Sequence, residues 1–224
     1  MTKVAVLLSG GLDSAVLVAE EAARNEVQPI YVSVGLAWEG AEREALGRLL
    51  AAPGFSRGVG PLISLSVDMR DVYAATHWAV TGRPPAYHTP DEDVYLPGRN
   101  IILLGKAGVY CAAAGIGRIA LGTLAHNPFP DATPEFRAAM AQALSLGLAH
   151  PLRIDAPYAG VRKAELIARG AALGVPLALT LSCMSPIDGR HCGVCSKCRE
   201  RHDAFLEAGT ADVTDYADSR YVGR

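Results

Sequence analysis

One short stretch constrains the fold of this 224-residue chain more than any other: VAVLLSGGLDSAVLV, residues 4–18. Its apolar run ends at Ser9, two glycines follow, and after Asp13 and Ser14 the apolar residues recur at helical spacing. A buried strand that turns directly into a helix explains this order, and such a turn presents helix N-terminal amides to an anion. The stretch therefore looks like a phosphate-binding loop, although it contains no lysine.

The remainder of the chain alternates between continuous apolar runs and helical patterns. We expect strands at residues 3–9, 29–35, 61–67, 118–122 and 153–155, and helices at residues 14–24, 38–52, 99–114, 134–148 and 162–173. Strands that alternate with helices and read as unbroken apolar runs are typical of an α/β fold with a doubly wound parallel sheet.

The overall composition favours a small-molecule substrate. Lys and Arg total 21 and Asp and Glu total 23, which gives a net charge of -2, whereas proteins that bind nucleic acid are usually basic. The sequence contains no apolar run long enough for a membrane span, and its N-terminus lacks the features of a signal peptide. We therefore expect a cytoplasmic protein without nucleic-acid or membrane partners.

The residues of the first loop have chemical roles that follow from their types. Gly10 and Gly11 allow the backbone to approach a phosphate closely, Ser9 and Ser14 can donate hydroxyl hydrogen bonds, and Asp13 can position magnesium. A Walker loop needs its lysine to reach the β- and γ-phosphates. Without that lysine, the loop suits holding pyrophosphate while the α-phosphate is attacked, which indicates adenylyl transfer. The alternative is a glycine-rich turn without a ligand.

Four of the five cysteines form a cluster, Cys183-x8-Cys192-x2-Cys195-x2-Cys198. Clustered cysteines in a reducing compartment indicate a metal rather than disulfides, and four thiolates complete the tetrahedral shell of a structural zinc ion. Cys111 lies in an apolar helical pattern and is expected in the core. Two nearby histidines could substitute as ligands: His191 and His202. Basic residues nearby would offset the negative charge of the thiolates: Arg190, Lys197, Arg199 and Arg201.

A long irregular segment, residues 82–98, follows the third expected strand. It is rich in proline and contains the acidic run Asp91-Glu92-Asp93. Long loops inside compact domains are commonly lids or binding loops, so we expect this segment at the active site. The alternative is a solvated excursion.

Several motifs together resemble a known family. They are SGGLDS (9–14), YLPGRN (95–100), FPDATPEF (129–136), RKAELI (162–167), LSC (181–183) and HCGVCSKCRERHDAFLEAG (191–209). The chain is similar to the 7-cyano-7-deazaguanine synthases, a family of PP-loop (N-type) ATP pyrophosphatases with an adenine nucleotide alpha hydrolase-like sheet. The resemblance implies one structural zinc ion per chain, a homodimer, a PP-loop ATP-binding domain at residues 1–180, and a zinc-binding segment at residues 181–224 packed on it.

The resemblance also implies a reaction. An ATP-dependent ligase of this family forms C–N bonds, converting 7-carboxy-7-deazaguanine and ammonia to 7-cyano-7-deazaguanine (preQ0) in queuosine-type biosynthesis. ATP would bind with Mg²⁺. The family's overall reaction is commonly written with ADP and phosphate as products, whereas the loop favours AMP and pyrophosphate.

The resemblance identifies further candidate residues beside the loop. The catalytic candidates are Asp13, which can position magnesium, and Arg99 and Lys163, because phosphoryl chemistry needs cations where negative charge develops. The ATP-binding candidates are Ser9, Gly10, Gly11, Leu12, Asp13, Ser14 and Asn100. For the planar substrate, Phe129 would stack on the base and Asp131 would accept paired N–H donors. The alternatives are solvated surface charges for Arg99 and Lys163, and a turn or cap role for Asp131.

The chain departs from the family pattern at three places. Gly35-Leu36-Ala37-Trp38 stands where the family favours Gly-Gln-Arg-His, and Phe129-Pro130-Asp131-Ala132-Thr133 replaces Tyr-Pro-Asp-Cys-Arg. Cys183-Met184 replaces Cys-Tyr. Polar groups are thinned at the substrate end, so the sequence indicates the activation chemistry more firmly than the substrate.

Two other classes of function fit some of these features. One is a different PP-loop carboxylate-activating ligase or a tRNA-modifying enzyme. Thiolation of tRNA would need a catalytic cysteine in the sheet domain, where Cys111 is the one candidate. The other is a zinc-ribbon binding module that does not turn over ATP.

Overall fold

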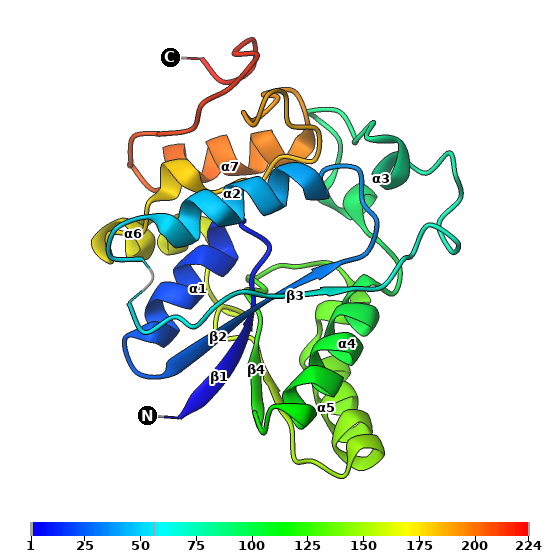
Figure 1. Cartoon of the computed structure of the whole chain (residues 1–224). Helices are drawn as coiled ribbons and strands as arrows, with labels where there is room; N and C mark the ends of the chain where they lie inside the picture. The colour runs from blue at the N-terminus through cyan, green and yellow to red at the C-terminus, as the bar shows by residue number, and fades with distance from the viewer. Residues whose placement is uncertain (1, 56, 224) are drawn as a thin grey trace.

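The computed structural model describes residues 2–55 and 57–223. Its centre is a parallel sheet of five strands in the order β3-β2-β1-β4-β5 (Figure 1). The strands are β1 (Lys3–Leu7), β2 (Glu26–Ser33), β3 (Ile63–Ser66), β4 (Arg118–Ala120) and β5 (Arg153–Asp155). The expected doubly wound parallel sheet is confirmed.

Helices cover both faces of this sheet, as Figure 1 shows. One face carries α1 (Leu12–Ala22), α2 (Glu39–Ala51), α6 (Lys163–Ala172) and α7 (Ser196–Glu207), and the other carries α4 (Arg99–Ala113) and α5 (Pro134–Leu148). A short helix, α3 (Trp78–Thr81), lies in the connection between β3 and α4.

Successive side chains of β1 supply the two cores in turn. Val4 and Val6 pack in the cluster with Leu17 of α1 and Phe205 of α7, whereas Ala5 packs in the cluster with Leu104 of α4. All six side chains are almost fully buried. Because side chains of a strand alternate between the faces, a sheet covered on both sides needs an unbroken apolar run, which is the pattern seen in the sequence.

The expected elements are all present, with ends that shift by a few residues. The bounds of α5 and β5 agree with the sequence prediction, and β2 begins three residues earlier than expected. The sequence reading assigned no helix after residue 173, but α7 occupies Ser196–Glu207. Its charged, weakly apolar sequence hid the helical period, and its stability comes from packing against α6. The division at residue 180 stays a prediction.

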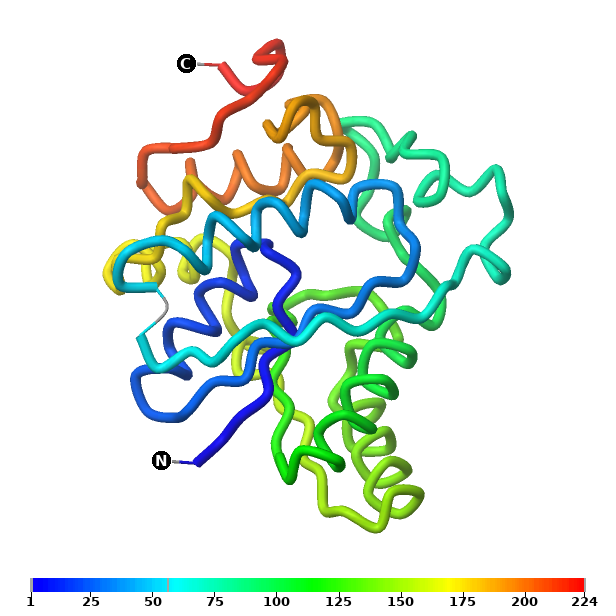
Figure 2. The backbone as a smooth tube through the Cα atoms, in the orientation of Figure 1, coloured from blue at the N-terminus to red at the C-terminus, as the bar shows by residue number. Residues whose placement is uncertain are grey.

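The segment at residues 82–98 lies against the start of α7, as the tube in Figure 2 shows in teal and orange. Ala86 pairs with Cys195 through an isolated antiparallel bridge. The Arg199 guanidinium donates to the carbonyl oxygens of Tyr87 (3.0 Å) and Thr89 (2.9 Å) and to the carboxylate of Asp91 (2.8 Å). These contacts fix the segment to the cysteine-containing region.

In the part of the chain that the structure describes, no helix combines the length and the apolar character needed to cross a bilayer.

Candidate active site

A cavity of about 540 Å³ opens at the carboxyl ends of the central strands. Its walls come from the loop after β1, the start of α2, residues 91–96, the start of α4, the loop after β4, and the starts of α6 and α7. In open parallel sheets, this edge is where ligands bind. The expectation that residues 82–98 border the site is confirmed, because four of them line the cavity: Asp91, Val94, Tyr95 and Leu96.

The first loop forms the floor of this cavity. Gly11 caps α1, and its N–H donates to Ser9 Oγ at 3.3 Å, while Ser14 Oγ donates to the Gly11 carbonyl at 3.0 Å. Gly10 does not line the cavity; it makes the turn with φ of +84°, and its carbonyl accepts the N–H of Leu181 at 2.8 Å. A side chain at Gly10 would be strained in this left-handed conformation. The loop therefore presents the first amides of α1 to the cavity.

Asp13 and Lys163 meet at this floor. Lys163 Nζ lies 3.3 Å from Asp13 Oδ2 and 2.6 Å from Glu200 Oε1. Burial alone would lower the pKa of Lys163, but the two carboxylates outweigh it and raise that pKa above its usual range. Asp13 Oδ1 is buried and has no hydrogen-bond partner within residues 2–55 and 57–223. One carboxylate oxygen is thus left for a ligand of the cavity.

Arg99 lies at the first position of α4, after Gly98. Its side chain lines the cavity, and among the described residues its buried Nε has no hydrogen-bond partner. A partly buried guanidinium with an unused, buried donor is suited to an anionic ligand.

Asn100 and Asp131 are bound to each other. The Asn100 backbone N–H donates to Asp131 Oδ2, and the Asn100 side-chain amide donates to the Asp131 carbonyl, both at 3.0 Å. Asp131 therefore caps α4 from the loop after β4, which is the alternative that the sequence left open. Both residues also line the cavity, so the cap and a ligand contact are compatible.

Aromatic side chains form two stacked pairs in the cavity wall. Phe129 stacks on Tyr95 with ring centroids 5.1 Å apart, and Trp38 stacks on Trp78 at 5.6 Å. Phe129, Trp38 and Met184 stand at the three departures from the family pattern, and all three line the cavity. The three departures therefore place apolar side chains in this part of the cavity wall.

Glu42 is a cavity residue that sequence analysis did not single out. Its carboxylate, 8 % exposed, accepts hydrogen bonds from Tyr31 OH (2.9 Å) and Trp38 Nε1 (3.1 Å). Burial raises the pKa of Glu42 to about 7, against a smaller opposing effect of the positive charge of Arg99. The sequence carries no signal that Glu42 faces the cavity, because an acidic residue in a helix is usually solvated.

Lys197 and Glu200 were also missed as site residues. Both lie in the first turns of α7 and line the cavity, and Lys197 Nζ is 2.5 Å from Glu200 Oε2. Burial alone would raise the pKa of Glu200, but Lys163 and Lys197 hold it far below its usual range. The spacing of three residues on a helix predicts an ion pair, but not one that faces a cavity.

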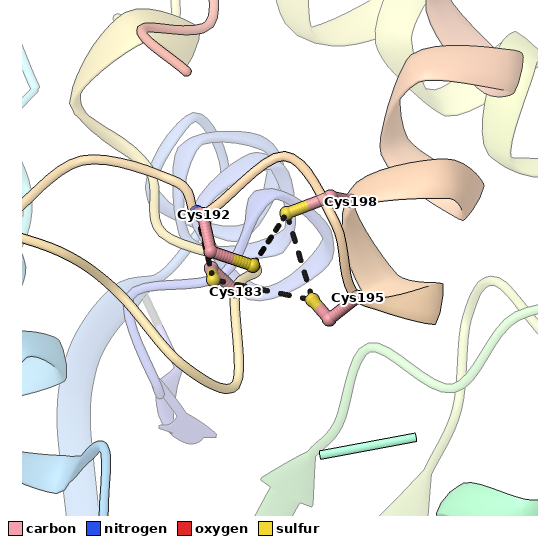
Figure 3. A group of neighbouring side chains, drawn as sticks. All are labelled: Cys183, Cys192, Cys195 and Cys198. Atoms are coloured by element: carbon pink, nitrogen blue, oxygen red, sulfur yellow. Dashed lines mark hydrogen bonds between the residues drawn. The ribbon is translucent and has the colours of Figure 1, made fainter. Parts of the chain in front are cut away.

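The four clustered cysteines converge in one buried group, as Figure 3 shows. Their Sγ atoms lie within 4.8 Å of one another, with separations of 4.0 Å (Cys183–Cys195), 3.8 Å (Cys192–Cys198) and 3.5 Å (Cys195–Cys198). These distances exceed the roughly 2.05 Å of a disulfide. Ligands about 2.3 Å from a tetrahedral zinc ion are about 3.8 Å apart, so the donor set fits such an ion.

Backbone amides support the same group. The N–H groups of Ser185 and Cys192 donate to Cys183 Sγ, and the N–H of Gly193 donates to Cys198 Sγ. Gly193 has φ of +79°, and a Cβ there would fall on the carbonyl oxygen of Asp218. Hydrogen bonds to thiolate sulfur favour the ligand form of cysteine.

The neighbouring histidines are engaged elsewhere. His191 Nε2 accepts the N–H of Ser182 at 3.1 Å, and His202 Nδ1 lies 3.1 Å from Asp212 Oδ2. The metal-binding group among the described residues consists of the four cysteines. Of the basic residues nearby, Arg201 is fully buried and donates to Thr180 Oγ1 and to the Leu177 carbonyl.

Cys111 lies in α4 and is fully buried in the core, as expected. Burial raises the pKa of its thiol to about 12. Such a thiol is inert at neutral pH, and Cys111 is not among the residues that line the cavity.

Taken together, the parallel sheet, the serine–glycine–glycine turn after β1 and the cavity above it define a PP-loop protein of the adenine nucleotide alpha hydrolase-like class. A solved 4-thiouridine synthetase–RNA complex with bound ATP shares this fold, with a TM-score of 0.50 and 16% identity over 83% of this chain and 45% of that chain.

The sequence comparisons identify a narrower group of proteins than the fold does. The model of a family described as "Queuosine biosynthesis protein QueC" matches residues 3–209. The chain is 34% identical to a 7-cyano-7-deazaguanine synthase of Anaeromyxobacter dehalogenans (strain 2CP-C), over 95% of this chain and 94% of that protein. It is 33% identical to the synthase of that name from Xanthomonas campestris pv. campestris (strain B100), over 98% of this chain and 100% of that protein. The chain belongs to the QueC family.

Proposed function

We propose that this protein is an ATP-dependent ligase that converts 7-carboxy-7-deazaguanine and ammonia to 7-cyano-7-deazaguanine in queuosine-type biosynthesis. Membership of the QueC family and the names of its relatives support the product and its place in queuosine biosynthesis. The observation that carries the proposal is the meeting of the PP-loop, Arg99, Lys163 and the loop at residues 129–131 around one cavity. Phosphate-binding and base-binding groups thereby face the same space.

The reaction begins with activation of the carboxylate. A substrate carboxylate oxygen attacks the α-phosphorus of ATP, the bond to the β-phosphate oxygen breaks, and pyrophosphate leaves with that electron pair. The first amides of α1, together with Ser9 and Ser14, hold the pyrophosphate. Arg99 and Lys163 stabilise the negative charge that develops on the phosphoryl oxygens, which is the main catalytic contribution available to such a site.

Ammonia then forms the first C–N bond. Its lone pair attacks the activated carbonyl carbon, AMP leaves with the acyl–oxygen electron pair, and a proton is lost to give the amide. Activation of the amide oxygen by a second ATP, followed by loss of AMP and the remaining N–H protons, gives the nitrile. Each activation releases AMP and pyrophosphate, in agreement with a loop that lacks the Walker lysine.

Two metal ions fit residues of this chain. Asp13 Oδ1, buried and without a partner among the described residues, suits Mg²⁺ bound together with ATP phosphates. The four-sulfur group suits one zinc ion per chain, and four protein ligands leave no open position, so its role is structural. Magnesium would neutralise phosphate charge during transfer.

Substrate recognition falls to the loop after β4. Phe129, stacked on Tyr95, offers an aromatic surface to the planar deazapurine, and Asp131 offers its carboxylate to paired N–H donors. Asn100 holds Asp131 in place through its backbone N–H. Asn100 thus contributes to the substrate end through Asp131, in addition to the ATP contact that the sequence resemblance implies.

The thiolation alternative lacks a nucleophile. Cys111 is buried with a raised pKa, and the other four cysteines are gathered in the metal-binding group. A ligase acting on a different carboxylate remains the second outcome of the experiment below, because Trp38 and Met184, which depart from the family pattern, line the cavity.

Product analysis tests the proposal. The protein is incubated with Mg-ATP, ¹⁵N-ammonium and 7-carboxy-7-deazaguanine, and the base and nucleotide products are identified by mass. We expect ¹⁵N-labelled nitrile together with AMP and pyrophosphate, and no ATP consumption when the acid is omitted. If the protein turned over ATP with unrelated carboxylates and not with the deazaguanine acid, the proposed substrate would be wrong and only the proposed activation of a carboxylate by ATP would stand. A homodimer, which the resemblance implies, is checked by light scattering of the same sample.

A further inference from the structure

The PP-loop lacks a lysine, and the structure brings two lysines to it from distant parts of the chain. Asp13, Lys163, Glu200 and Lys197 form a continuous row of charges on one wall of the cavity. The separations along the row are 3.3, 2.6 and 2.5 Å. Lysine and carboxylate alternate, so the row is neutral before any ligand binds.

The row is mostly removed from solvent. Side-chain exposure is 14 % for Lys163, 22 % for Glu200 and 28 % for Lys197. Ion pairs that are fully exposed to solvent contribute little to stability. Partly buried charges such as these act more strongly on an ion that enters the cavity. Glu200 holds one lysine with each of its two oxygens, and therefore sets the separation of the two ammonium groups.

Lys197 occupies a special place in the sequence. It lies between Cys195, the N-cap of α7, and Cys198 in the first turn of that helix, which carry two of the four converging sulfurs (Figure 3). Cys195 is the N-cap residue of α7, so the backbone that carries Lys197 is fixed by the same residues that would hold the metal.

We propose that Lys197 is a second polyphosphate-binding lysine, which the metal-binding segment supplies to the PP-loop and which Glu200 keeps beside Lys163. The proposal rests on the ATP-dependent function above. When a nucleotide enters, the two ammonium groups turn from Glu200 toward the phosphate oxygens and replace the charge that a Walker lysine provides. Glu200 remains between them and prevents their mutual repulsion from separating them.

This arrangement couples the metal site to the nucleotide site. Loss of the metal would release the backbone at Cys195 and Cys198 and with it the position of Lys197. Adenosine binding would be unaffected, because adenosine carries no phosphate for the Lys197 ammonium group to bind.

Binding measurements on the full chain test the proposal without the ligase reaction. Isothermal titration with Mg-ATP, Mg-pyrophosphate and adenosine is carried out on wild type, Lys197→Met and Lys197→Arg. We expect Lys197→Met to weaken Mg-ATP and Mg-pyrophosphate binding by about tenfold or more, to leave adenosine binding unchanged, and to keep its metal content. Lys197→Arg, which retains the charge, should recover most of the loss. Lys106→Met, at an exposed position of α4 outside the cavity, is the matched control.

Unchanged pyrophosphate affinity in Lys197→Met would overturn the proposal, as would an equal loss for adenosine, since that indicates damage to the whole cavity. The proposed function fails differently: wild-type protein would bind Mg-ATP and yet form no nitrile. If Lys197→Met reduces the metal content, the same titrations are carried out on Lys197→Gln, whose side chain is also neutral. With its metal retained, Lys197→Gln must still lose pyrophosphate affinity if the proposal is correct.

Discussion

Lys163 Nζ lies 3.3 Å from Asp13 Oδ2, although the two residues are 150 positions apart in the chain. The pair joins the first turn of α1 to the first residue of α6. It can form because β1, β4 and β5 are successive parallel neighbours in the sheet, so that the loops after β1 and β5 open at the same edge. The cation missing from the PP-loop is thereby supplied from the second half of the fold.

Replacement of this lysine is expected to abolish turnover. In Lys163→Met, phosphoryl charge would develop without its nearest cation, and loss of one such group reduces turnover by about 100-fold or more. Asp13 would lose its partner ammonium group, and Glu200 would keep only Lys197, so the melting temperature should fall. Single-turnover ATP consumption and calorimetry measure the two effects, and Lys106→Met serves as control. Wild-type turnover in Lys163→Met would remove Lys163 from the mechanism.

The cysteine group should hold one equivalent of zinc. Cys195→Ser removes one of four ligands, so both the metal content and the melting temperature are expected to fall, because binding at a structural site contributes directly to folding. The matched control is Cys111→Ala, a buried cysteine outside the group. Elemental analysis of purified protein provides the measurement. A full equivalent of zinc in Cys195→Ser would show that this residue is not a ligand.

Asp131 allows its two roles to be separated. Asp131→Asn keeps an oxygen that can accept the Asn100 N–H but removes the negative charge, whereas Asp131→Ala removes both. We expect both variants to weaken binding of the deazaguanine acid, Asp131→Ala by on the order of 100-fold. Only Asp131→Ala should also lose about 1 kcal/mol of stability as a lost helix cap. ATP affinity should change in neither.

Titration calorimetry and urea unfolding distinguish these effects. If Asp131→Asn binds the acid as tightly as wild type, Asp131 acts on α4 alone and the base is recognised by other groups.

Glu42 should make stability depend on pH. Its folded-state pKa of about 7 lies above the usual value of 4.5, so the folded protein binds this proton more tightly than the unfolded chain does. Its stabilising contribution is therefore complete below about pH 4.5 and is lost as the pH rises through about 7. The raised pKa corresponds to about 3 kcal/mol. Glu42→Gln, which is neutral at every pH, should gain on wild type by up to that amount between pH 5 and pH 8.

Urea unfolding of wild type and Glu42→Gln at pH 5, 6.5 and 8 measures the difference, in which the titration of all other groups cancels. A difference that does not vary with pH would mean that Glu42 stays ionised in the folded protein throughout this range.

Local patterns in the sequence determined the class of fold and predicted two of its sites. The alternation of apolar runs with helical periods predicted the parallel sheet, because the period of burial is a property of neighbouring residues. The glycines and hydroxyls of residues 9–14 predicted an anion-binding turn for the same reason. The spacing of Cys183, Cys192, Cys195 and Cys198 predicted a convergent donor set, which the structure bears out.

Tertiary structure alone decided which charges face the cavity. The sequence predicted only that Lys197 would offset the charge of the thiolates, and it did not single out Glu200 or Glu42. The packing of α7 and α2 against the sheet brings all three to the cavity. Asp131 and Asn100 share hydrogen bonds because the loop after β4 passes over the start of α4. Contacts of this kind depend on strand order and helix packing, which fix distances between residues far apart in the chain. The spacing of residues along the sequence does not reveal these distances.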